Sequence, residues 1–103
     1  MRNRSAKEIT SPEVGKEISG TVDIRGTANI PDFGFYKYEV APLHSDVWAT
    51  ISAGRQTHVN ESLGKWDTTA VTPGDYQLRL VATDNQGQAL PACIIPVRVL
   101  PPS

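Results

Sequence analysis

The clearest pattern in the sequence is the run Thr72-Pro73-Gly74-Asp75-Tyr76-Gln77-Leu78-Arg79-Leu80-Val81-Ala82. It opens with a turn by composition, because proline presets φ and glycine accepts a positive φ. Every second position that follows is then apolar or aromatic: Tyr76, Leu78, Leu80 and Ala82. A period of two is typical of a strand with one face on a core. The run therefore predicts a turn followed by a core strand.

The same alternation extends to both sides of this run. It predicts strands at residues 18–28, 35–40, 63–69 and 93–99, a short first strand near Ile9, and a hairpin-like turn at 84–87. Residues 56–62 are expected to form a short strand or a turn. Residues 47–53 fit either a helix capped by Ser45 or a strand, and the short segment rich in Val, Trp, Thr and Ile favours the strand.

About seven short strands with a turn every ~8–12 residues predict an all-β fold, an antiparallel sandwich of two sheets. The expected structural core comprises Val22, Ile24, Tyr36, Tyr38, Trp66, Tyr76, Leu78 and Leu80. Trp48 is interpreted as mainly core as well, because buried aromatic side chains dominate small cores. Phe35 lies on the polar face of its strand and is the candidate for an exposed contact, with Trp48 as the second candidate.

Length and composition exclude several functional classes. The chain has 103 residues, a net charge of −1 and one cysteine. That length suits one small domain, and one cysteine excludes an internal disulfide and a cysteine-based zinc site. A nucleic-acid or anionic-membrane partner needs a basic face, which the near-zero charge disfavours. Since no apolar run approaches the ~20 residues of a membrane span, we expect no membrane insertion.

The chain divides into a domain and two flanks. Residues 1–8 are expected to be a disordered arm or residues added to an excised fragment, with Arg2, Arg4 and Lys7 as a small solvated basic cluster. Residues 9–100 are expected to be the domain. Residues 101–103 resemble a linker, because proline cannot continue a ladder. A compact unit with such flanks looks cut from a longer protein.

Three groups of residues carry a family resemblance. They are Ile24-x-Gly26-x-Ala28 with Phe33-x-x-Tyr36-x-Tyr38-Glu39, then Trp48-x-x-Ile51, then Leu63-x-x-Trp66-Asp67-Thr68 with Pro73-Gly74-x-Tyr76-x-Leu78-Arg79-Leu80-Val81-Ala82-x-Asp84-x-x-Gly87. Together they resemble the immunoglobulin/fibronectin-III-like domains of bacterial cell-envelope proteins. Among these are the C-terminal domains of some penicillin-binding proteins, the peptidoglycan transglycosylase–transpeptidases, and similar domains accompany secreted hydrolases. In such sandwiches, a tyrosine placed like Tyr76 packs its ring in the core and hydrogen-bonds its hydroxyl to nearby backbone.

Other chemically active residues have ordinary structural interpretations. Asp67, Asp75 and Asp84 form no calcium-type run, and turn or cap roles suit the last two. His44 and His58 are expected to be solvated loop residues rather than zinc ligands. Cys93 is expected to be a small buried hydrophobic residue. No spacing marks a nucleophile with its base, so we expect no catalytic residue, metal or cofactor in this domain.

The resemblance implies an extracytoplasmic, non-catalytic spacer or docking module whose partners are the neighbouring domains of its parent chain. We expect a monomer. The alternative is a module that binds a cell-wall glycan, which exposed coplanar aromatic rings would favour. An independent enzyme is the least supported interpretation, because no acid/base pair emerges.

Overall fold

The alternating segments form eight strands in the computed structural model, which describes residues 7–90 and 93–101. The elements are β1 (Lys7–Ser11), β2 (Glu17–Ile18), β3 (Thr21–Ala28), β4 (Phe33–Pro42), β5 (Ala49–Gly54), β6 (His58–Asp67), the 3₁₀ turn η1 (Thr68–Ala70), β7 (Gly74–Asp84) and β8 (Cys93–Val99). The described residues contain no helix with the length and hydropathy of a membrane span.

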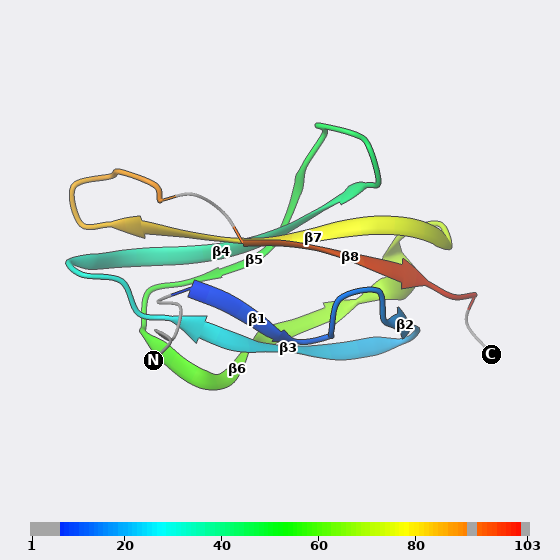
Figure 1. Ribbon diagram of the computed structural model, residues 1–103, viewed down its shortest axis with the longest axis horizontal. Coiled ribbons are helices and arrows are strands. Elements are labelled where there is room, and N and C mark those ends of the chain that lie inside the picture. The colour runs from blue at the N-terminus through cyan, green and yellow to red at the C-terminus, as the bar shows by residue number, and fades with distance from the viewer. Residues whose placement is uncertain (1–6, 91–92, 102–103) are drawn as a thin grey trace.

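The strands pack as two face-to-face sheets (Figure 1). One sheet has the order β1-β3-β6, and the other has the order β2-β8-β7-β4-β5. Neighbouring strands are antiparallel except β2 and β8, which pair in parallel over two residues. The expected all-β two-sheet sandwich is confirmed. It has eight strands instead of about seven, because the strand expected at 18–28 is divided. Ile18 ends β2, which pairs with β8, and β3 of the other sheet begins only at Thr21.

The core lies between the two sheets. Fully buried side chains include Ile24, Tyr38, Leu78 and Leu80, and Tyr36 and Trp66 are 4% and 3% exposed. Two residues expected in the core lie at its border instead. Val22 is half-buried where one edge of the sandwich opens, and Tyr76 is half-buried at the start of β7.

Two tyrosines tie the sheets together. The hydroxyl of Tyr36 donates to the carbonyl oxygen of Leu63 at 2.7 Å, and that of Tyr38 donates to the carbonyl oxygen of Lys65 at 2.9 Å. Burial raises the pKa of both phenols, which therefore stay protonated as donors. Both acceptors flank Gly64 of β6, so β4 of one sheet is fixed to one short stretch of the other.

Several expected boundaries differ from the structure. The polar segment 56–62 and the segment from residue 63 onward form one strand, β6, because the irregularity at Gly64 shifts the register without ending the pairing with β3. The ambiguous segment is strand β5, not a helix. Strand β1 already begins at Lys7, before the expected domain start, because it pairs with β3 from Lys7 onward. The rest of the expected arm, with Arg2 and Arg4, and residues 102–103 of the expected tail lie outside the described residues.

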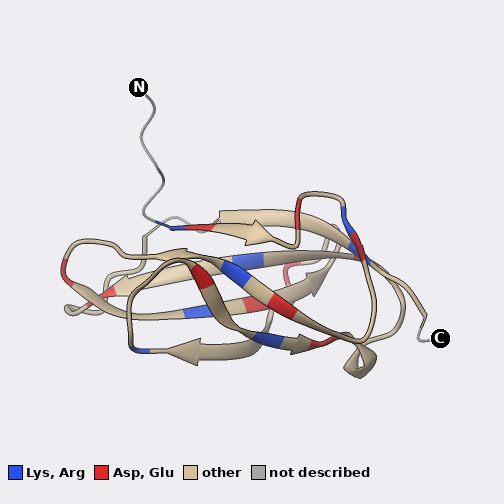
Figure 2. Cartoon of the chain, turned by 90° about the horizontal axis from the view of Figure 1, so that it is seen from below, with Lys and Arg blue, Asp and Glu red and all other residues tan. Residues whose placement is uncertain are grey.

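The sandwich is elongated, with extents of 41 × 29 × 22 Å. Its first described strand starts toward the left of Figure 1, and β8 ends at the right, near the end of the long axis. Figure 2 shows Lys and Arg interspersed with Asp and Glu along the strands, with no face of a single sign in that view. The long axis therefore separates the points at which the described chain enters and leaves.

Candidate functional site

The outer face of the five-stranded sheet carries a buried carboxylate network. Glu39 of β4 is 5% exposed. Its Oε1 accepts from Nε of Arg79 on β7 at 2.6 Å, and its Oε2 accepts from Oγ1 of Thr50 on β5 at 3.0 Å. The ammonium of Lys37 lies 3.4 Å from Oε2. Three neighbouring strands thus converge on one acid, which strand alternation alone places on the solvent side.

Electrostatics favour the charged form of Glu39. Burial by itself raises the pKa of this carboxyl, but the bonds from Arg79 and Thr50 and the charges of Arg79 and Lys37 outweigh it. The net result is a pKa below the usual value of Glu. A carboxylate satisfied in this way is a structural anchor and not a general acid, because a general acid needs a proton to give near neutral pH.

Trp48 lies on this outer face and not in the core between the sheets. The guanidinium carbon of Arg79 is 4.0 Å from the centroid of its ring, and the side chain is half-buried. The segment after β4 folds back over the sheet, where Nε2 of Gln77 donates to the carbonyl oxygen of Ser45 at 2.8 Å. The mainly-core interpretation of Trp48 is therefore wrong. One face of the indole is already occupied by Arg79, which leaves only the other face for a stacked group.

Phe35 is the more accessible aromatic residue, with 38% of its surface exposed. It borders a shallow hollow of about 240 Å³ together with Ala53, Gly54 and Arg55 at the end of β5. An exposed ring next to a guanidinium could contact a planar or sugar-like group. The two aromatic candidates do not come together, since Trp48 packs over Arg79 of β7 and Phe35 lies against β5.

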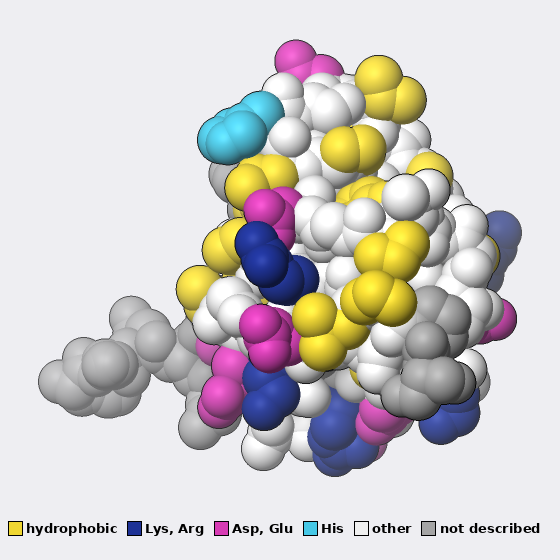
Figure 3. Space-filling view, turned by 90° about the vertical axis from the view of Figure 1, so that its right-hand side faces the viewer, with side chains coloured by type: hydrophobic (Ala, Val, Ile, Leu, Met, Phe, Trp, Pro, Cys, Tyr) yellow, Lys and Arg dark blue, Asp and Glu magenta, His cyan; other side chains and the backbone are white. Residues whose placement is uncertain are grey.

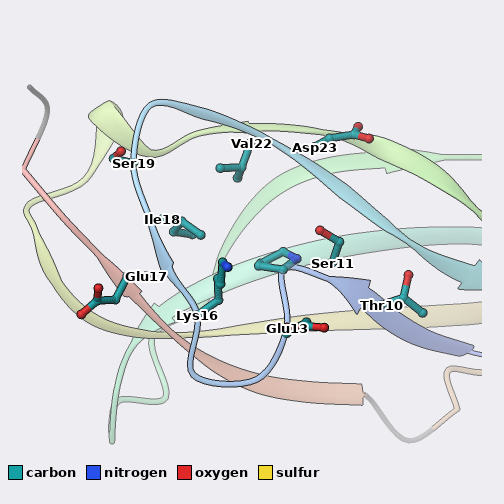
Figure 4. A pocket seen from close by; sticks show the side chains of 10 residues that line it. Thr10, Ser11, Glu13, Lys16, Glu17, Ile18, Ser19, Val22 and Asp23 are labelled. Atoms are coloured by element: carbon teal, nitrogen blue, oxygen red, sulfur yellow. The ribbon is translucent and has the colours of Figure 1, made fainter.

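A cleft of about 570 Å³ lies at the open edge of the sandwich (Figure 4). Ile18 of β2 and Val22 of β3 lie in its middle, between loop residues 12–16 and the two sheets. It opens because β1 pairs with β3 only up to Arg25, which leaves the start of β3 uncovered on that side. No periodicity or motif signalled this cleft, because it depends on where the chain changes sheets.

The rim of this cleft has mixed charge. It carries carboxylates from Glu13, Glu17 and Asp23, and the ammonium of Lys16. Asp23 is already engaged, because it accepts from the hydroxyl of Ser62 at 2.6 Å, which is the main cause of its lowered pKa. Across residues 7–90 and 93–101, no three His, Cys, Asp or Glu side chains come together as a metal site requires.

The three aspartates discussed above each serve local structure. Asp67 accepts from the backbone N–H and the hydroxyl of Thr69 and caps η1. Asp75 lies on β7 and pairs with Arg98 of β8 at 2.9 Å, so it bridges two strands instead of serving the expected turn or cap. Asp84 accepts from two backbone N–H groups of the following turn, which confirms its turn role. Their separate engagements leave no shared calcium cage.

The remaining candidates are also placed. His44 occupies a positive-φ turn position, but His58 lies on β6 and not in a loop. Its Nδ1 is 2.6 Å from a carboxylate oxygen of Glu61, and its ring meets that of Tyr36 edge-on. His58 is half-buried because β6 begins at this residue, before the strand expected from residue 63, and brings the imidazole against Tyr36. Cys93 is half-buried against the core.

The hydroxyl of Tyr76 donates to the carbonyl oxygen of Thr72 at 2.5 Å, as expected for a tyrosine corner. This bond lies in an exposed position at the end of the sandwich. The ring packs against the core only in part, because Tyr76 is the third residue of β7 and lies near the end of the sandwich.

Comparisons with known proteins identify the fold. No family model and no curated protein matches the sequence. Among solved structures, the fibronectin(III)-like modules of Clostridium thermocellum CbhA match with a TM-score of 0.66 and 14% identity, over 94% of this chain and 99% of that chain. The endo-beta-1,4-mannanase from Thermotoga petrophila matches with a TM-score of 0.64 and 19% identity, over 95% of this chain and 20% of that one. This chain has a fibronectin-III-like β-sandwich fold.

Proposed function

We propose that this chain is a non-catalytic accessory module of a larger extracytoplasmic protein, in which it spaces or docks a neighbouring domain. The observation that carries the proposal is the elongated body, in which the described chain enters and leaves at separated points of a 41 Å axis. The hydroxyls of Tyr36 and Tyr38 fix one sheet to the other. A body tied in this way can hold two neighbours at a set distance.

The fold comparisons support an accessory role. The similar chain in CbhA is described as a fibronectin(III)-like module, and the matched part of the mannanase is one fifth of that chain. The mannanase is by its name an enzyme that acts on a polysaccharide, which favours a secreted or envelope parent for this chain. The motif from Trp66 to Gly87 adds a narrower proposal, namely that the parent is a peptidoglycan-synthesising penicillin-binding protein.

The second candidate is a glycan-binding module, and the hollow at Phe35 is the observation that favours it. Phe35 exposes 38% of its surface beside Arg55, and aromatic rings with polar neighbours are common in binding sites. The accessory interpretation is preferred, because Trp48 is stacked on Arg79 and cannot form a platform with Phe35.

Depletion by insoluble polysaccharides distinguishes the two candidates. The purified chain is mixed with peptidoglycan, cellulose or mannan, and the protein left in solution is measured. The accessory proposal expects no depletion by any of the three. Depletion that disappears in Phe35→Ala but persists in Val59→Ala, which changes an exposed apolar residue on β6 of the other sheet, would establish the glycan-binding candidate instead. Unchanged melting temperatures would show that both variants are folded.

A further inference from the structure

We draw no further inference here: the strongest candidate, the cleft beside the uncovered start of β3 with Ile18 and Val22 in its middle, has a rim of mixed charge, and nothing in the structure shows what covers it.

Discussion

Gly64 is a position at which a single methyl group should disturb both the backbone and the packing of the core. Its φ is +147°, and an added Cβ would collide with the hydroxyl of Tyr38. Left-handed or otherwise strained backbone costs a non-glycine residue about 1–3 kcal/mol. Overpacking in a well-filled core adds about 1–3 kcal/mol. Gly64→Ala should therefore lower the free energy of unfolding by roughly 2–6 kcal/mol.

A matched variant and a double-mutant cycle separate the two causes. Gly87 has φ +85°, but an added Cβ there meets nothing within 4 Å. Gly87→Ala should therefore show backbone strain alone, about 1–2 kcal/mol. In a Tyr38→Phe background the colliding oxygen is gone, and the nearest remaining atom, Cζ of residue 38, lies 3.3 Å from the added Cβ. Gly64→Ala should then cost less by about 0.5–3 kcal/mol, the range for residues in contact.

Urea denaturation of the four members of the cycle gives these energies from midpoints and slopes. Tyr38→Phe alone should cost about 0.5–1.5 kcal/mol, the net value of one hydrogen bond. Energies at Gly64 and Tyr38 that add within about 0.5 kcal/mol would refute the contact between them. A Gly64→Ala cost no larger than that of Gly87→Ala would refute the packing argument as a whole.

Three further outcomes follow from the contacts described above. The fold holds the pKa of Glu39 below its usual value of 4.5, so ionised Glu39 stabilises the fold above that pH, and this stabilisation is lost as pH falls through the lowered pKa. Below pH 4.5, the melting temperature of Glu39→Gln should therefore depend less on pH than that of the unchanged chain. An equally steep fall in the melting temperatures of both proteins would contradict this. Tyr76→Phe should cost about 0.5–1.5 kcal/mol in urea denaturation, because the bond to Thr72 is exposed; no change in midpoint would remove the tyrosine-corner assignment. Trp48→Ala should cost at least the ~0.5–2 kcal/mol of a cation–π contact with Arg79, and a wild-type midpoint would show that the contact does not stabilise the fold.

The sequence predicted the sheet interior well, for a local reason. Alternation determines which side chains share a face, so the positions of Leu78, Leu80, Tyr38 and Ile24 in the core follow from their spacing. The Pro-Gly-x-Tyr turn likewise carries the corner bond within five residues of chain.

The buried carboxylate, the position of Trp48 and the cleft depend on which distant segments of the chain meet. Local spacing in the sequence does not determine that. Alternation places Glu39 on the solvent side, and only the return of the chain after β4 and the arrival of β7 bury it. The same return places Trp48 over Arg79, whereas its sequence neighbours suggested a core strand. The cleft at Ile18 and Val22 arises where β1 leaves β3. Each of these features is a property of strand pairing and not of a motif.

The surface at the end of the sandwich where β8 terminates is relevant to the proposed docking role. Figure 3 looks at the end where β8 terminates and shows hydrophobic side chains from the upper right to the middle of that face and along its left side, with charged side chains between the two groups and along the lower margin. Such a surface beside the point where the described chain leaves suits contact with a neighbouring domain.

The distance between the entry and exit points tests the spacer role most directly. Spin labels at residues 7 and 101, in a Cys93→Ala background that removes the single native thiol, report the distribution of that distance by pulsed electron paramagnetic resonance. The account predicts one narrow distance that does not change when peptidoglycan fragments or mannan oligosaccharides are added. A broad distribution, or a distance that shifts with added glycan, would contradict a rigid module that positions its neighbours without a ligand of its own.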